Sequence, residues 1–188
     1  MSKTGRAYRL TPADRERLGL CVHEAAHAVV GVLNGGTVER AILTEGGTDG
    51  TCDFTAESFA LDRARYRRAL VAAAGPAAAA IFSHGPQPTA HQIDAHLGAG
   101  DREELRLAGL HSYSTADEQL WAALPVVRRC WRSIGTLAAK MMRGQEVGHG
   151  DVLAALGVTD GGGPGSSQLA AIRARGTLQP VTSPRPCR

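Results

Sequence analysis

Residues 11–36 read TPADRERLGLCVHEAAHAVVGVLNGG and carry the clearest helix signal in the chain. Thr11 is a typical helix N-cap, and Pro12 suits the first helical position because a proline there loses no hydrogen bond. Apolar residues then recur at helical intervals as far as Leu33, and two glycines follow. The sequence therefore predicts one long helix that begins at Pro12 and ends before Gly35.

This helix contains the sequence His23-Glu24-Ala25-Ala26-His27, which is an H-E-x-x-H pattern. Histidines at positions i and i+4 lie one turn apart on the same helix face, so both imidazoles can bind one Zn²⁺ ion. Glu24 lies beside that face and can act on water at the metal as a general base. The plainer alternative is a chance match, with both histidines on an ordinary helix face.

A catalytic zinc ion needs a third protein ligand and an open position. The chain does not continue as H-E-x-x-H-x-x-G-x-x-H, so the third ligand must come from a distant segment. The candidates are Asp101, Glu104, His91 and His96. Asp101 is the preferred ligand because it begins a predicted helix, although Asp101 and Glu104 could equally form a capping box.

The rest of the chain predicts further helices and one small hairpin. Aromatic residues make up only 4% of the sequence and alanines are frequent, which favours closely packed helices. The prediction is a mainly α (α+β) domain over residues 11–157, after a flexible N-terminus at 1–10 and before a disordered Gly/Pro/Ser-rich tail at 158–188. The expected elements are strands at 38–43 and 51–54, a helix at 61–82 kinked or divided at Pro76, a loop at 83–100, a helix at 101–110, a helical region at 115–143 broken near Pro125, and a short helix at 151–156.

Composition argues against several other classes of protein. The net charge of the chain is +3. The arginines in its basic clusters alternate with apolar residues, a pattern typical of solvated helix faces, so no nucleic-acid partner is expected. The four cysteines are scattered, which fits a reducing compartment. No apolar run is long enough to span a bilayer. The sequence thus predicts a cytoplasmic protein with no membrane span.

Three stretches together resemble the peptidase domain of the FtsH-type ATP-dependent proteases, and more closely the small stand-alone FtsH-peptidase-like proteins. Residues 23–28 resemble the family's H-E-A-G-H-A segment, residues 73–78 its A-G-x-A-A-E helix, and residues 98–101 its G-A-x-x-D stretch, whose aspartate is the third zinc ligand. The resemblance covers about residues 11–157. Ala79 or Ala80 stands where the family has a glutamate, and a one-residue shift around Asp101 leaves Glu104 as an alternative ligand.

The resemblance implies a zinc-dependent metalloendopeptidase with Glu24 as general base. The sequence has no G-x-x-x-x-G-K-[ST] phosphate loop, so no ATPase module is expected in these residues. The substrate would be a short peptide or an unfolded protein, or it would be delivered by a separate ATPase or oligomeric partner. The hairpin edge could hold the substrate in extended form by strand addition. The alternatives are a catalytically inactive zinc-binding adaptor of the same fold, a regulatory protease specific for one partner, and a purely structural helical protein.

Overall fold

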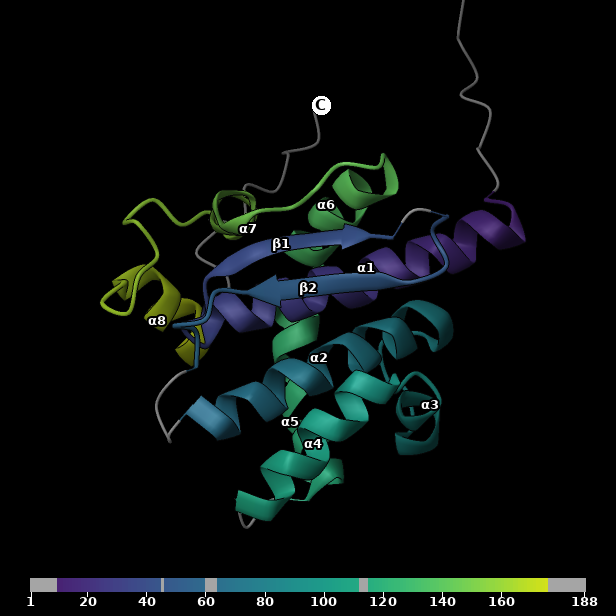
Figure 1. Cartoon of the computed structure of the whole chain (residues 1–188), viewed down its shortest axis with the longest axis horizontal. Coiled ribbons are helices and arrows are strands. Elements are labelled where there is room, and N and C mark those ends of the chain that lie inside the picture. Colours follow the sequence, from purple (N-terminus) through teal and green to yellow (C-terminus); the bar gives the residue numbers. More distant parts are fainter. Residues whose placement is uncertain (1–9, 45, 60–63, 112–114, 176–188) are drawn as a thin grey trace, which may run out of the picture.

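The structure is a computed structural model that describes residues 10–44, 46–59, 64–111 and 115–175. It is mainly helical with one small antiparallel sheet, so the predicted fold class is confirmed (Figure 1). The predicted flexible N-terminus lies, except for Leu10, outside the described residues. No helix in the described part of the chain combines the length and apolar character that crossing a membrane requires.

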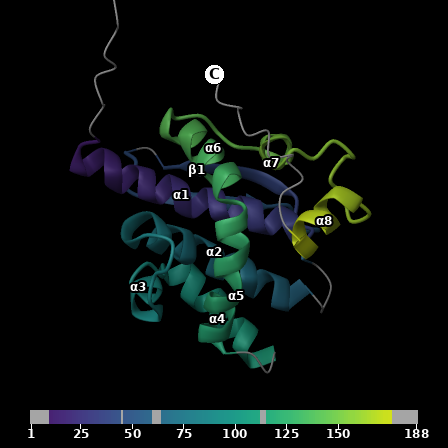
Figure 2. The same cartoon turned by 180° about the vertical axis from the view of Figure 1, so that it is seen from behind.

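Helix α1 (Pro12–Leu33) lies at the centre of the fold. A capping box at its start satisfies backbone groups, since Asp14 N donates to Thr11 Oγ1 over 3.1 Å and Thr11 N donates to Asp14 Oδ2 over 3.2 Å. The helix ends at Leu33 with Asn34 as its C-cap, so the predicted bounds are confirmed. The hairpin and the helices at residues 131–142 and 149–156 lie on one side of α1, and the helices between residues 64 and 129 lie on the other (Figures 1 and 2).

Strands β1 (Val38–Leu43) and β2 (Gly50–Phe54) form the predicted hairpin, with Ala41 opposite Cys52. The outer edge of β1 is partly covered, because the backbones of Ala41 and Val147 exchange hydrogen bonds of 2.8 and 2.9 Å. Among the described residues, no strand pairs with the outer edge of β2. This edge therefore presents backbone donors and acceptors that have no strand partner in the described part of the chain.

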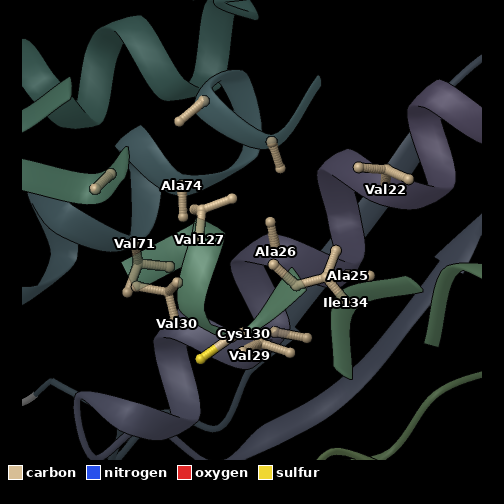
Figure 3. Close-up of a cluster of buried hydrophobic side chains, with 14 of the residues drawn as sticks. Val22, Ala25, Ala26, Val29, Val30, Val71, Ala74, Val127, Cys130 and Ile134 are labelled. Atoms are coloured by element: carbon tan, nitrogen blue, oxygen red, sulfur yellow. The ribbon is translucent and has the colours of Figure 1, made fainter. Parts of the chain in front are cut away.

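Helix α2 (Ala64–His84) packs along α1 through small side chains. Its alanines between Ala69 and Ala80 are buried, and Figure 3 shows Val71 and Ala74 of α2 in the same apolar cluster as Val30 of α1. Small residues allow the two helix backbones to approach closely, as the alanine-rich sequence predicts. The helix continues through Pro76 without being divided.

The remaining helices of the predicted domain pack on α2 or on α1. The expected loop at 83–100 is wrong in part, because Thr89 caps a short helix, α3, there. The expected break near Pro125 is also wrong, since the chain instead breaks at Cys130. Pro125 has no N–H to donate to the carbonyl of Trp121. The helix tolerates this loss because both residues are exposed. The elements are α3 (Ala90–Asp94), α4 (Ala99–His111), α5 (Ala116–Arg129), α6 (Trp131–Met142) and α7 (His149–Leu156).

The predicted disordered tail is wrong for residues 158–175, which include a packed helix, α8 (Ser167–Arg175). Leu169 and Ile172 are each 1% exposed, so α8 belongs to the core. Arg173 donates from Nη1 to the carbonyl of Leu33 over 2.6 Å, which ties α8 to the end of α1. Residues 176–188 lie outside the described part.

Candidate metal centre

His23 and His27 lie one turn apart in the central part of α1. Their ring centroids are 4.6 Å apart, and both rings face the side of α1 on which α2 packs. His27 is buried and His23 is half-buried. The helical spacing therefore holds two imidazoles in place before any ligand binds, as the sequence predicts.

Asp101 approaches both histidines from the first turn of α4. Its Oδ2 atom lies 3.2 Å from His23 Nε2, and its Oδ1 atom lies 3.2 Å from His27 Nε2. The ligand atoms of the three side chains all lie within 4.8 Å of one another, so the group could hold a metal ion. In the described part of the chain, no other cluster of three histidine, cysteine, aspartate or glutamate side chains has this arrangement.

The distances fit ligands around a common ion. Ligands at about 2.0–2.1 Å from a tetrahedral metal lie roughly 3.3 Å from one another. The 3.2 Å contacts of Asp101 to His23 and His27 match this spacing, and they also fall at the upper end of the range for N–H···O hydrogen bonds.

A backbone carbonyl orients the ring of His27. Nδ1 of His27 donates to the carbonyl of Val71 over 2.8 Å, because a carbonyl can only accept. Nε2 is then the atom that faces Asp101, and it can offer its lone pair to a metal. A histidine ligand that donates its other N–H to a carbonyl is the usual outer-shell arrangement at metal sites.

The electrostatics of these three side chains favour positive charge at the centre. Burial lowers the pKa of His27, but the hydrogen bond and charge of Asp101 outweigh that effect and raise the pKa to about 9. Burial raises the pKa of Asp101, yet the contacts with His23 and His27 hold it well below its usual value. Asp101 therefore stays ionised and favours a cation between the two rings.

Gly75 of α2 provides the space at this centre. A Cβ atom built on Gly75 would lie 2.6 Å from His23 Nε2 and closer still to His27 Nε2. Those separations are near the bonding range of a metal, so any larger residue would occupy the place where an ion would bind. Sequence reasoning did not assign this role to Gly75, although it is the one glycine within the alanine-rich stretch of α2.

Glu24 lies beside the metal-binding group and is 7% exposed. Burial raises the pKa of its carboxyl group, and the nearby His27 and His23 oppose that rise. The start of β2 lies next to this side chain, since a Cβ atom added to Gly50 would be 2.6 Å from Glu24 Cγ. The structure thus holds Glu24 between α1 and β2, outside the group of three ligands.

The centre opens into a cleft of about 740 Å³. Its walls come from α1, β2, the turn after β2, α2 and the start of α4. The free edge of β2 runs along one wall, and Phe54 and Phe59 add an aromatic surface. The cleft is large enough for a segment of extended chain to reach the three side chains and Glu24.

The other candidate ligands do not join the group. Glu104 also lines the cleft, but its Oε1 atom accepts a hydrogen bond of 2.7 Å from Arg68 Nη2. His91 is exposed on α3, and the ring of His96 lies 5.8 Å from that of His84. Asp101 is therefore the candidate that the fold brings to His23 and His27.

No known family model and no curated protein sequence matches this chain. The interpretation of the site therefore depends on its own geometry.

Proposed function

We propose that the chain is a zinc-dependent metalloendopeptidase in which Glu24 is the general base. The observation that carries the proposal is the meeting of His23, His27 and Asp101 at the wall of an open cleft, with Glu24 beside them. Two imidazoles and one carboxylate are a ligand set that suits zinc, and three protein ligands leave a position free for catalysis.

Each of these residues has a separate task in the proposed reaction. Zinc bound there would lower the pKa of a water molecule toward roughly 7 and polarise the scissile carbonyl. Glu24 would accept the proton from water and return it to the leaving amine. Asp101 would hold its negative charge at the ion, and the Val71 carbonyl would keep the His27 ring oriented.

The cleft supports a peptide as the substrate. The free edge of β2 lies along it, and an extended peptide can pair with such an edge through backbone hydrogen bonds. Those bonds need only an unfolded backbone, so short peptides and unfolded proteins are the proposed substrate class. A separate ATPase or an oligomeric partner that delivers folded proteins belongs to the same proposal.

The resemblance to the FtsH-type peptidase domain agrees with this proposal. Its zinc-binding aspartate corresponds to Asp101, and Asp101 is the acidic residue beside His23 and His27. We therefore propose that residues 11–157 are a peptidase domain of this type, with α8 packed against it.

The test compares the wild type with Glu24→Gln. Both proteins should contain about one zinc ion per chain by metal analysis, while Glu24→Gln should cleave an unfolded protein roughly 10²–10⁴-fold more slowly. Equal cleavage rates would contradict the role of Glu24. Stoichiometric zinc with no cleavage of any member of a broad peptide library would favour the inactive adaptor, and cleavage of a single partner protein would favour the regulatory protease. Absence of zinc from both proteins would overturn the proposal.

A further inference from the structure

The cleft extends well beyond the metal centre, and two close contacts fix its direction. At one end, Gly50 lies so near Glu24 that a Cβ atom added to Gly50 would be 2.6 Å from Glu24 Cγ. Farther along, the ring of Phe54 presses on Gly31, where a Cβ atom would overlap the ring. Strand β2 therefore runs beside α1 from Glu24 toward its C-terminal end, as Figure 1 also shows.

These two contacts give a measure of length along the cleft. From Gly50 to Phe54 the strand advances about 13 Å, at roughly 3.3 Å per residue. From Glu24 to Gly31 the helix advances about 10 Å, at 1.5 Å per residue. A peptide extended along β2 would thus pass Phe54 about three or four residues from the bond that faces Glu24.

An aromatic pair occupies this distant part of the cleft. The rings of Phe54 and Phe59 meet edge to face with centroids 5.3 Å apart, and both residues are half-buried and line the cleft. Phe59 in turn presses against Gly36, where a Cβ would lie 2.5 Å from its Cζ atom. Gly31 in α1 and Gly36 just after it thus allow the two rings to pack closely against this part of the chain. The rings still present apolar surface to the cleft.

The backbone of Phe59 gives a second, independent indication. Its φ angle is +62°, and among the described residues it is the one non-glycine residue with a positive φ. A bulky side chain in the left-handed region is strained, and residues held this way concentrate at binding and catalytic sites. A glycine would adopt this φ angle without strain, so a phenylalanine at this position suggests that its side chain has a role.

We propose that Phe54 and Phe59 form an apolar subsite that selects substrates with a large apolar side chain three or four residues from the scissile bond. This inference rests on the proposed function, because it needs a peptide aligned along β2. The ligand is an extended peptide segment that carries leucine or a similar side chain at that distance, on one side of the bond. The subsite would therefore bind a part of the substrate that takes no part in the chemistry.

The experiment uses short peptides of equal length in which a single leucine moves one position at a time through a background of serine and alanine. For the zinc-loaded wild type, kcat/KM should rise roughly tenfold when leucine reaches the third or fourth residue from the cleaved bond. In Phe59→Gly, which suits the backbone angle, the ratio between the best peptide and its serine counterpart should fall to about one. Phe59→Leu should restore much of the ratio, and Trp121→Ala, which removes an exposed aromatic outside the cleft, should leave it unchanged.

Binding of the same peptides to zinc-loaded Glu24→Gln separates the two proposals. Cleavage without any dependence on leucine position, or a dependence that survives in Phe59→Gly, would overturn the subsite and leave the peptidase proposal standing. Binding that follows leucine position without any cleavage by the wild type would support the subsite and overturn the peptidase proposal. Absence of both binding and cleavage would overturn both.

Discussion

Gly75 of α2 lies so close to His27 of α1 that a single added carbon would overlap the Nε2 atom of the histidine. The His27 ring is buried and its Nδ1 atom donates to the carbonyl of Val71, so the ring cannot rotate away without losing that hydrogen bond. A glycine inside a helix usually destabilises it relative to alanine by about 0.5–1 kcal/mol. Here the missing side chain leaves room for an ion.

Gly75→Ala should therefore lose zinc. Metal analysis of the purified variant should find far less than one ion per chain, although the intrinsic helix propensity of α2 would improve. Gly135→Ala is the matched control, because Gly135 lies in α6 with no atom near its missing Cβ. That control should keep its zinc and be at least as stable as the wild type. Stoichiometric zinc in Gly75→Ala would contradict the placement of the site.

Gly50→Ala should separate catalysis from metal binding. Its new Cβ would push against Cγ of Glu24, whereas no atom of His23, His27 or Asp101 lies among the nearest contacts of Gly50. We expect zinc content to stay near that of the wild type while the rate of peptide cleavage falls. Thr48→Ala, an exposed change in the same turn, should leave both unchanged. A fully active Gly50→Ala protein would show that the position of Glu24 does not limit the rate.

Asp101→Ala should weaken zinc binding by more than about 100-fold, since even partners outside the ligand shell contribute about 10–100-fold. Glu104→Ala is the informative control, because Glu104 is an acid on the same helix that pairs with Arg68 instead. Titration with a competing chelator should find the affinity of Glu104→Ala close to that of the wild type. The reverse result would make Glu104 the third ligand.

Ile172→Ala should destabilise the protein by about 2–5 kcal/mol, the usual range for truncating a buried isoleucine. Ile172 is 1% exposed, whereas its neighbour Ala171 on the same helix is exposed. Urea unfolding should show a large loss for Ile172→Ala, but only the small cost of a lower helix propensity for the control Ala171→Ser. Equal stability of the two variants would mean that α8 is not part of the folded core.

The sequence predicts most of the fold because its strongest signals are local. The N-cap at Thr11 and the regular apolar spacing define α1, and the hairpin follows from two β-prone runs around a glycine-rich turn. The sequence favours Asp101 as the third ligand but leaves Glu104 open, and the two are separated only by the packing of α4 on α2, which no local pattern contains. The space at Gly75 was missed for the same reason, since it exists only between two helices.

The error at α8 has a different cause. Residues 161–167 have the composition of a flexible linker, and the two buried apolar side chains of α8 are too few to outweigh that signal. In the structure, the Asp160 carboxylate accepts hydrogen bonds from Ser166 Oγ at 2.7 Å and from the backbone N–H of Gln168 at 3.2 Å. A single acid thus orders the start of a helix that composition alone would leave out.

Helix α4 packs mainly on α2 and less on α5, and it reaches α1 chiefly through Asp101. An ion shared by His23, His27 and Asp101 would therefore link the first helix of the domain to a segment more than seventy residues later in the chain. Removing the ion with a chelator would weaken the attachment of α4 before the rest of the molecule unfolds, so amide protons of α4 would exchange with solvent sooner than those of α1. Ion binding at the centre would then be coupled to the ordering of α4, which forms one wall of the cleft.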